Sequence, residues 1–211
     1  MDLTWYGLSC FRITERNYAT VVTDPYSDDI GLPSLKLKAD ILTISHDAPG
    51  HNCDTAVVGF QHALTGPGEY EIGGVFVTGI AGPRKTNNDR RNTIFVFEYK
   101  GLTIAHLGDI ERVPTQAQID ALGQVNVLLL PVGGGNTLNA SQAAEVVSML
   151  EPNIVVPMHY AIDGLALELD SLERFLKEIG VTDAEPESGL RVSVGSLPEE
   201  TQVVILTPKL S

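Results

Sequence analysis

Four of the five histidines follow short apolar runs, where their side chains are well placed to hold a cation. The run "DILTIS" leads to His46 and His51, "LTIA" leads to His106 and Asp109, and "NIVVPM" leads to His159. Imidazole and carboxylate groups suit Zn, Fe or Mn, and ligands carried on rigid strands are in position before a metal arrives. Spacing alone leaves open that each histidine only hydrogen-bonds a loop at its strand end.

Other polar positions carry weaker indications of chemistry. His62, in "GFQHALTG", is expected on the surface or in a hairpin. Asp24, in "VVTDPY", precedes a proline, where aspartate often makes a turn. It could equally orient a ligand histidine from behind. The glycines at 133–135 lack both the GxGxxG spacing and a Walker lysine, so we interpret them as a tight loop rather than a nucleotide site.

The elements that must position these residues are short β runs, joined first by turns and later by helices. Turns at 73–74 and 100–101 predict two hairpins. Helices are expected over 114–123, 139–152 and 170–180. Asn139 can cap the second helix, and Asp170 with Glu173 matches a capping box at the third. Many strands with a few helices predict an α/β layered domain.

Length and charge narrow the class of protein. A chain of 211 residues predicts one domain over 1–211. Its formal net charge of −13 argues against nucleic acid or an anionic membrane as partner. We therefore expect the partner to be a small-molecule substrate or ligand. Two cysteines without a CxxC pair, and no secretory pattern, predict a cytoplasmic protein. No apolar run approaches the roughly 20 residues of a membrane span. The sequence leaves open whether the protein forms a homo-oligomer.

Taken together, these segments resemble the metallo-β-lactamase-fold superfamily over nearly the whole chain, and most closely its small Zn-dependent hydrolase-like branch. The matching stretches come in the family's order: "TWYGLSCF", "VVTDPY", "ILTISHDAPGHN", "GPGEYEIGGVFVTGI", "NTIFVFEYKGLTIAHLGD", "VLLLPVGGGNTL" and "VVPMHY". The resemblance implies a four-layer αββα sandwich with the site at one edge of the two sheets.

The same resemblance implies which residues would hold metal. Members usually carry a dinuclear site built on H-x-H-x-D-H, a later His, the Asp of a "GD" and a final His. Here His46 matches the first position of the motif and His51 the last. Asp109 in "HLGD" matches the bridging Asp, and His159 in "PMHY" matches the final His.

Several family positions are replaced in this sequence. Ala48 stands where the second motif His belongs, and Gly50 where the Asp belongs. Asp47 could replace that Asp only from a position that is offset in sequence. Leu8 replaces the His usual in the opening "W-x-G-H-S", and the stretch 81–92 lacks the separate later His. The resemblance therefore implies an eroded metal motif with at most one ion.

The surviving residues then predict the chemistry. His51, Asp109 and His159 are expected to hold one Zn, with Mn or Fe as alternatives, and His46 is a further ligand or neighbour. Asp109, His46 and Asp24 would handle protons or orient groups in hydrolysis of a small ester, lactone or phosphoester. The losses favour reduced or lost activity, and the alternative is an inactive member serving as a binding or interaction module. Redox chemistry at a mononuclear iron is a third option.

Overall fold

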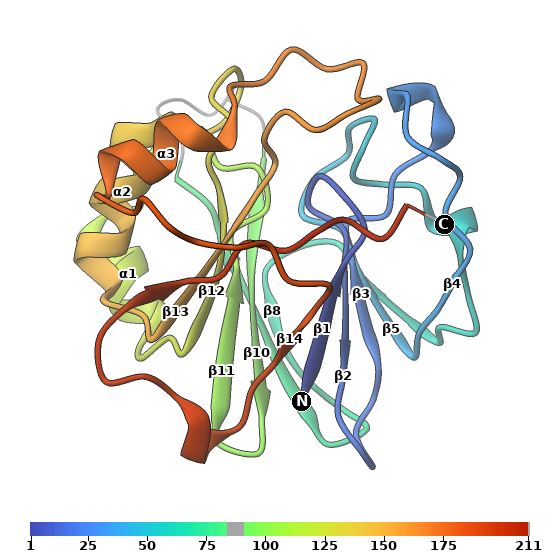
Figure 1. The fold of residues 1–211 in the computed structure, drawn as a ribbon. Coiled ribbons are helices and arrows are strands. Elements are labelled where there is room, and N and C mark those ends of the chain that lie inside the picture. The colour runs from blue at the N-terminus through green and yellow to red at the C-terminus, as the bar shows by residue number, and fades with distance from the viewer. Residues whose placement is uncertain (84–90, 211) are drawn as a thin grey trace.

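The computed structural model describes residues 1–83 and 91–210, which form two β-sheets packed face to face (Figure 1). The first sheet has the strand order β14-β1-β2-β3-β5-β7. Its strands are β1 (Asp2–Trp5), β2 (Phe11–Thr14), β3 (Val21–Thr23), β5 (Ile41–Thr43), β7 (His62–Leu64) and β14 (Leu190–Arg191). A separate pair joins β4 (Leu37–Lys38) to β6 (Val57–Val58).

The second sheet has the order β15-β13-β12-β11-β10-β9-β8. Its strands are β8 (Gly68–Ile72), β9 (Val75–Ala81), β10 (Thr93–Tyr99), β11 (Leu102–His106), β12 (Val127–Pro131), β13 (Ile154–Met158) and β15 (Gln202–Val203). Strands β12 and β13 are buried at every position, because one of their faces meets the first sheet and the other meets helices. That explains why their sequences are apolar without alternation.

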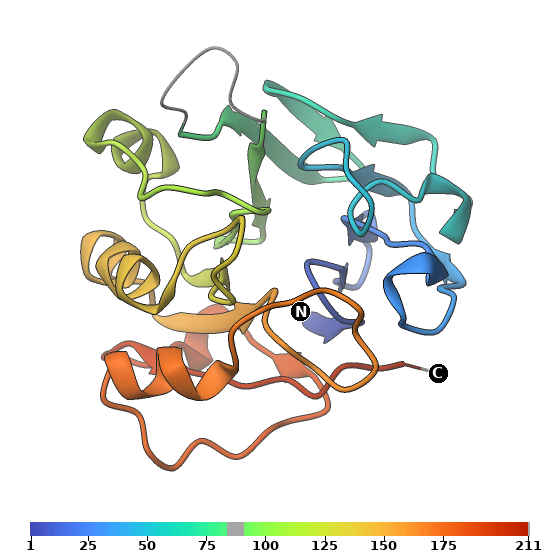
Figure 2. The ribbon, with the colours of Figure 1, turned by 90° about the horizontal axis from the view of Figure 1, so that it is seen from above.

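The α-helices of the described residues cover one side of the sandwich. They are α1 (Gln116–Leu122), α2 (Ala140–Leu150) and α3 (Leu172–Glu178). All three lie on the outer face of the second sheet, as the two views agree (Figures 1 and 2). Within the described ranges, no helix is long and apolar enough to cross a membrane.

The outer face of the first sheet is covered in another way. The β4–β6 pair and the 3-10 turns η1 (Asp28–Ile30) and η2 (Asp54–Ala56) lie there, and their apolar side chains pack with Val22 and Leu42. Prolines at 25, 33 and 49 interrupt this region and oppose a longer helix. The α/β sandwich expected of the metallo-β-lactamase fold is confirmed, with its fourth layer made of short turns in the described residues.

Both predicted hairpins are present. Ile72 pairs with Val75 across the first turn, and Tyr99 pairs with Leu102 across the second. The stretch 81–92, which lacks the later family His, lies partly outside the described residues, which resume at 91.

The helix caps divide into one correct and one wrong prediction. Asn139 accepts a hydrogen bond from the Gln142 N–H at 3.0 Å, so it caps α2 as expected. The prediction that Asp170 and Glu173 form a capping box is wrong, because α3 begins one residue later and has Ser171 at its N-cap. The main chain at Asp170 is used elsewhere, since its N–H donates to the Gly133 carbonyl at 2.6 Å.

Candidate metal centre

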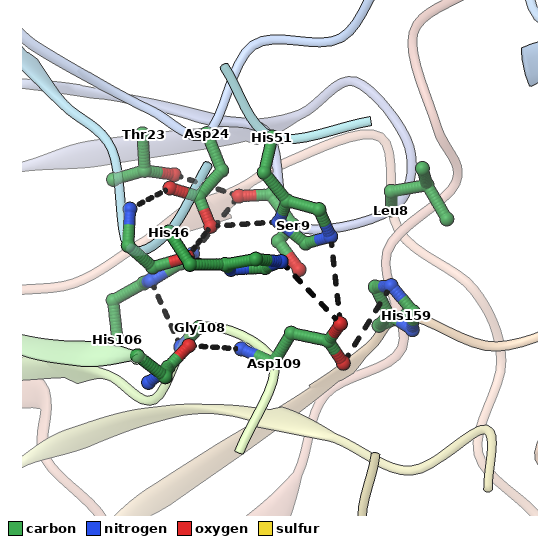
Figure 3. Close-up of polar contacts among 12 residues, drawn as sticks. Leu8, Ser9, Thr23, Asp24, His46, His51, His106, Gly108, Asp109 and His159 are labelled. Atoms are coloured by element: carbon green, nitrogen blue, oxygen red, sulfur yellow. Dashed lines mark hydrogen bonds and ion pairs between the residues drawn. The ribbon is translucent and has the colours of Figure 1, made fainter. Parts of the chain in front are cut away.

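Strands from both sheets deliver polar side chains to one edge of the sandwich. Strand β3 pairs in parallel with β5, and β12 pairs in parallel with both β11 and β13. Parallel strands end at the same edge of a sheet, which is where open α/β sheets place their ligands. Asp24 follows β3, His46 and His51 follow β5, and Asp109 and His159 follow β11 and β13; these five side chains lie together in Figure 3.

Asp109 is the centre of the cluster. Its Oδ2 lies 3.7 Å from His46 Nε2 and 3.8 Å from His51 Nε2, and its Oδ1 lies 3.8 Å from His159 Nε2 (Figure 3). All four side chains are buried. His46, His51 and Asp109 form the tightest group, with one donor atom from each within 4.8 Å of the others. His159 approaches the same carboxylate from its other oxygen.

A second carboxylate, Asp24, supports the cluster from behind. It is fully buried and accepts hydrogen bonds from the Ser45 N–H at 2.7 Å, the Ser45 hydroxyl at 2.5 Å and His51 Nδ1 at 3.0 Å. Burial alone would raise the pKa of this carboxyl. The hydrogen bond from His51, the electrostatic attraction of the nearby His106 and His51 rings and the Ser45 hydroxyl outweigh burial and lower that pKa to about 2. Asp24 is therefore ionised at neutral pH.

This carboxylate sets the tautomers of two histidines. His51 Nδ1 donates to Asp24, so in the neutral ring His51 Nε2 carries a lone pair. The Ser45 hydroxyl gives its hydrogen to Asp24 and so accepts from His46 Nδ1 at 3.0 Å, which leaves a lone pair on His46 Nε2 as well. Both lone pairs then face Asp109 Oδ2, a third electron-pair donor.

Three electron-pair donors facing one point repel each other unless a cation lies between them. Donors around a tetrahedral zinc ion lie roughly 3.4 Å apart, close to the 3.7 and 3.8 Å found between Asp109 Oδ2 and the two imidazoles. Imidazole and carboxylate are also the ligands of zinc sites. The residues of this cluster therefore fit a divalent metal ion.

Asn92 holds the loop that carries Asp109. Its side-chain oxygen accepts from the Asp109 N–H at 2.9 Å, and its amide donates to the Leu107 carbonyl at 3.0 Å. Gly108 lies between these two contacts with φ +63°, and a Cβ there would come within 2.6 Å of the Ser45 Cβ. The β11 loop is thus packed tightly against the β5 loop, which fixes the distance from Asp109 to the two histidines.

The other histidines have separate roles. His106 is fully buried, accepts from the Gly108 N–H at Nδ1 and so donates from Nε2 to the Ser9 carbonyl at 2.9 Å. Burial lowers the pKa of His106, consistent with a neutral ring that joins the two sheets. His62 is exposed on β7, as predicted.

The positions where the resemblance led us to expect further metal ligands add no donor to the cluster. Ala48 lines the pocket beside the cluster and carries no donor. Gly50 has φ +91°, and a Cβ built on it would lie 3.1 Å from Leu8 Cδ1, so buried Leu8 occupies the adjacent space. Asp47 accepts from the Asn52 amide at 2.5 Å and lines a neighbouring pocket instead.

Two pockets flank His46, each of about 450 Å³. The first opens on the cluster and is lined by His46, Ala48, Pro49, His51, Asp109, Gly135, Asn136, His159, Leu167, Glu168 and Leu169. The second lies on the other side of His46, between the β5 loop, Gly66 and Asn92. The site is therefore buried at its base and accessible from two sides.

Comparison with known proteins places this chain in a family. A family model described as the "Beta-lactamase superfamily domain" matches residues 2–159, about three-quarters of the chain. The chain belongs to the β-lactamase superfamily. The matched segment ends at His159, so it includes every residue of the cluster.

Several proteins of this superfamily are similar along most of the chain. The UPF0173 protein PF0020 of Pyrococcus furiosus is 29% identical over 91% of this chain and 100% of its own length. A UPF0173 metal-dependent hydrolase of Thermoplasma acidophilum is 24% identical over 76% of this chain and 83% of its own. A solved structure from Thermotoga maritima, described provisionally as a Zn-dependent hydrolase of the metallo-β-lactamase superfamily, is 33% identical, covers 97% of both chains and has a TM-score of 0.80.

The sequence alone did not point to Ser45 or Asn92. Ser45 directly precedes His46, so its place in "SHDAPGH" was the one available indication. Asn92 offered none, because its partners Leu107 and Asp109 are more than a dozen residues away.

Proposed function

We propose that this protein is a metal-dependent hydrolase with a single divalent ion, acting on a small ester, lactone or phosphoester. The observation that supports this most is the arrangement of His46 Nε2, His51 Nε2 and Asp109 Oδ2, whose lone pairs face one point at separations of 3.7 and 3.8 Å. Zinc is the proposed ion, because the donors are imidazoles and a carboxylate. The named hydrolases among the relatives agree with this class.

In this proposal the protein's own residues hold the ion and orient the imidazole rings. His46, His51 and Asp109 would hold the ion, and a divalent ion held there would supply Lewis-acid chemistry for hydrolysis. His159, beside Asp109 Oδ1 at 3.8 Å, steadies the carboxylate or serves as a fourth donor. Asp24 keeps the His51 and His46 rings in the tautomer that presents Nε2. Ala48 and Pro49 present apolar surface to the pocket, so they limit water beside the ion.

The second candidate is a protein that binds metal or ligand without turnover. The missing donors at Ala48 and Gly50 favour it, because a second ion would have no ligands there.

Metal analysis and turnover together separate these candidates. Mass-spectrometric metal counting on protein made without a chelating tag should find about one ion per chain, and less than about a tenth of that in His51→Ala and Asp109→Asn. His62→Ala, an exposed histidine outside the cluster, should keep the ion. Wild-type protein should hydrolyse activated esters or phosphoesters, and Asp109→Asn should not.

Three outcomes contradict the proposal in different ways. If the wild-type protein holds no stoichiometric metal, the proposed metal site is wrong. Turnover that survives Asp109→Asn places the reaction elsewhere in the molecule. Bound metal without turnover on any ester or phosphoester leaves the binding protein as the better description.

A further inference from the structure

The pocket over the cluster has an apolar wall. Leu167 and Leu169 lie on one side of it, and Ala48 and Pro49 lie beside His46. Leu167 is 40% exposed, although a leucine normally gains from burial. A leucine held open next to a candidate reaction centre provides surface for an apolar group of a ligand.

Main-chain hydrogen bonds hold this wall in place. The Ala166 N–H donates to the Ile30 carbonyl at 2.8 Å, and the Asp170 N–H donates to the Gly133 carbonyl at 2.6 Å. The segment from Leu167 to Leu169 lies between these two anchors. It is the loop between β13 and α3, which reaches across to the η1 turn in Figures 1 and 2. The wall is therefore formed before a ligand arrives, which lowers the entropy cost of binding.

Charges around the pocket disfavour an anion. The described residues that line the first pocket include Asp109 and Glu168 but no lysine or arginine. Those lining the second pocket add Asp47 and Arg91. The formal charge of these four groups is minus two, which one divalent ion would cancel. An anionic substrate would then find no net positive charge to replace its lost hydration.

Building on the proposed hydrolase function, we propose that the substrate is an uncharged ester or lactone whose apolar acyl group lies along Leu167 and Leu169. Phosphoesters are poor substrates in this assignment, because their charge meets Glu168 and Asp109 without an arginine or lysine among the described residues that line the first pocket. The ester carbonyl faces the cluster, and the alcohol part extends past His46 toward the second pocket.

Three model substrates test the substrate class on metal-loaded protein. They are p-nitrophenyl butyrate, p-nitrophenyl acetate and bis(p-nitrophenyl) phosphate. The butyrate should exceed the acetate in kcat/KM by about tenfold, because two more methylene groups are buried. The phosphodiester should be turned over more slowly than either ester. A phosphodiester preferred over both esters would overturn the inference while leaving the hydrolase proposal intact.

Matched variants locate the effect in the wall. Leu167→Asn should reduce the preference for butyrate over acetate by about fivefold; Val58→Asn, which alters another exposed aliphatic residue outside both pockets, should not. Glu168→Lys should raise kcat/KM for the phosphodiester relative to the ester by about fivefold. Glu178→Lys makes the same charge change on α3 and should leave that ratio unchanged. Equal effects in each variant and its control would show that the wall does not select substrate.

An equilibrium measurement tests the inference without turnover. Hexanamide is an uncharged acyl compound that should bind metal-loaded protein in calorimetry, and Leu167→Asn should weaken this binding by about fivefold. Inorganic phosphate should bind more weakly than hexanamide. Tighter binding of phosphate, or hexanamide binding unaffected by Leu167→Asn, would overturn the inference even if no ester is hydrolysed.

Discussion

At the scale of single residues, Asp24 acts on two candidate ligand histidines at once, on His51 directly and on His46 through Ser45. Asp24→Asn removes the negative charge and allows the side-chain amide to face His51, which disturbs the tautomer that presents Nε2. We expect metal affinity to fall by about 10–100-fold, measured by competition with a chromogenic chelator.

The control for this change is Asp40→Asn. Asp40 also accepts a main-chain hydrogen bond, from the Thr20 N–H at 2.8 Å, but it is exposed and lies outside the cluster. Its variant should keep wild-type affinity. Circular dichroism of both variants checks that they fold, and an unchanged affinity in folded Asp24→Asn would show that Asp24 does not orient the ligands.

Gly50 is a residue whose replacement tests backbone strain and crowding. It has φ +91°, and a Cβ would lie 3.1 Å from Leu8 Cδ1. Gly50→Ala should lower the free energy of unfolding by about 1–3 kcal/mol, measured by urea denaturation.

A second glycine separates the two causes. Gly180 also has positive φ, at +72°, with no atom within 4 Å of its Cβ position. Gly180→Ala therefore carries backbone strain alone and should cost less than Gly50→Ala. If Gly50→Ala costs no more than Gly180→Ala, the contact with Leu8 is not tight.

At the scale of elements, α2 begins at a cap whose geometry is complete. Asn139 accepts from the Gln142 N–H, and the Gln142 side chain accepts from the Asn139 N–H at 3.1 Å. Asn139→Ala should lower the free energy of unfolding by about 1 kcal/mol. Ser141→Ala, an exposed change in the same first turn, should cost less than about half of that. Urea denaturation of both variants measures the difference, and equal costs would argue against the cap.

Local patterns predicted most elements, and contacts distant in sequence decided the rest. The turns at 73–74 and 100–101 allowed both hairpins to be predicted, because a two-residue loop forces the strands on either side of it to pair. The start of α3 was misplaced by one residue because the Asp170 main chain is bonded to Gly133 rather than to the helix. No local pattern reports a bond over that distance.

The cluster was predictable to a similar extent. His46, His51, Asp109 and His159 each follow a strand, and the structure places the three histidines around the Asp109 carboxylate. The distances among them depend on Ser45 and Asn92, whose partners come from other strands. His46 lies closer to His51 and Asp109 than His159 does. This difference also results from packing between the sheets, which the order of residues does not show.

At the scale of the whole molecule, metal binding should stabilise the fold. The ligands come from both sheets, so an ion that binds only the folded chain adds about 2.7 kcal/mol when its concentration is 100 times Kd. For a chain of this length that corresponds to a rise in Tm of about 5–10 °C, measured by calorimetry with and without zinc. His51→Ala should abolish the rise, whereas His62→Ala should retain it. An equal rise in both variants would place the stabilising ion elsewhere.

The His159 N–H donates to the Leu8 carbonyl at 3.1 Å, so this residue of the cluster is bonded to a residue near the amino terminus. During synthesis, residues near the amino terminus must wait for β13 to emerge before this bond can close. If the proposed ion takes His159 as a fourth donor, its uptake should therefore follow assembly of the two sheets.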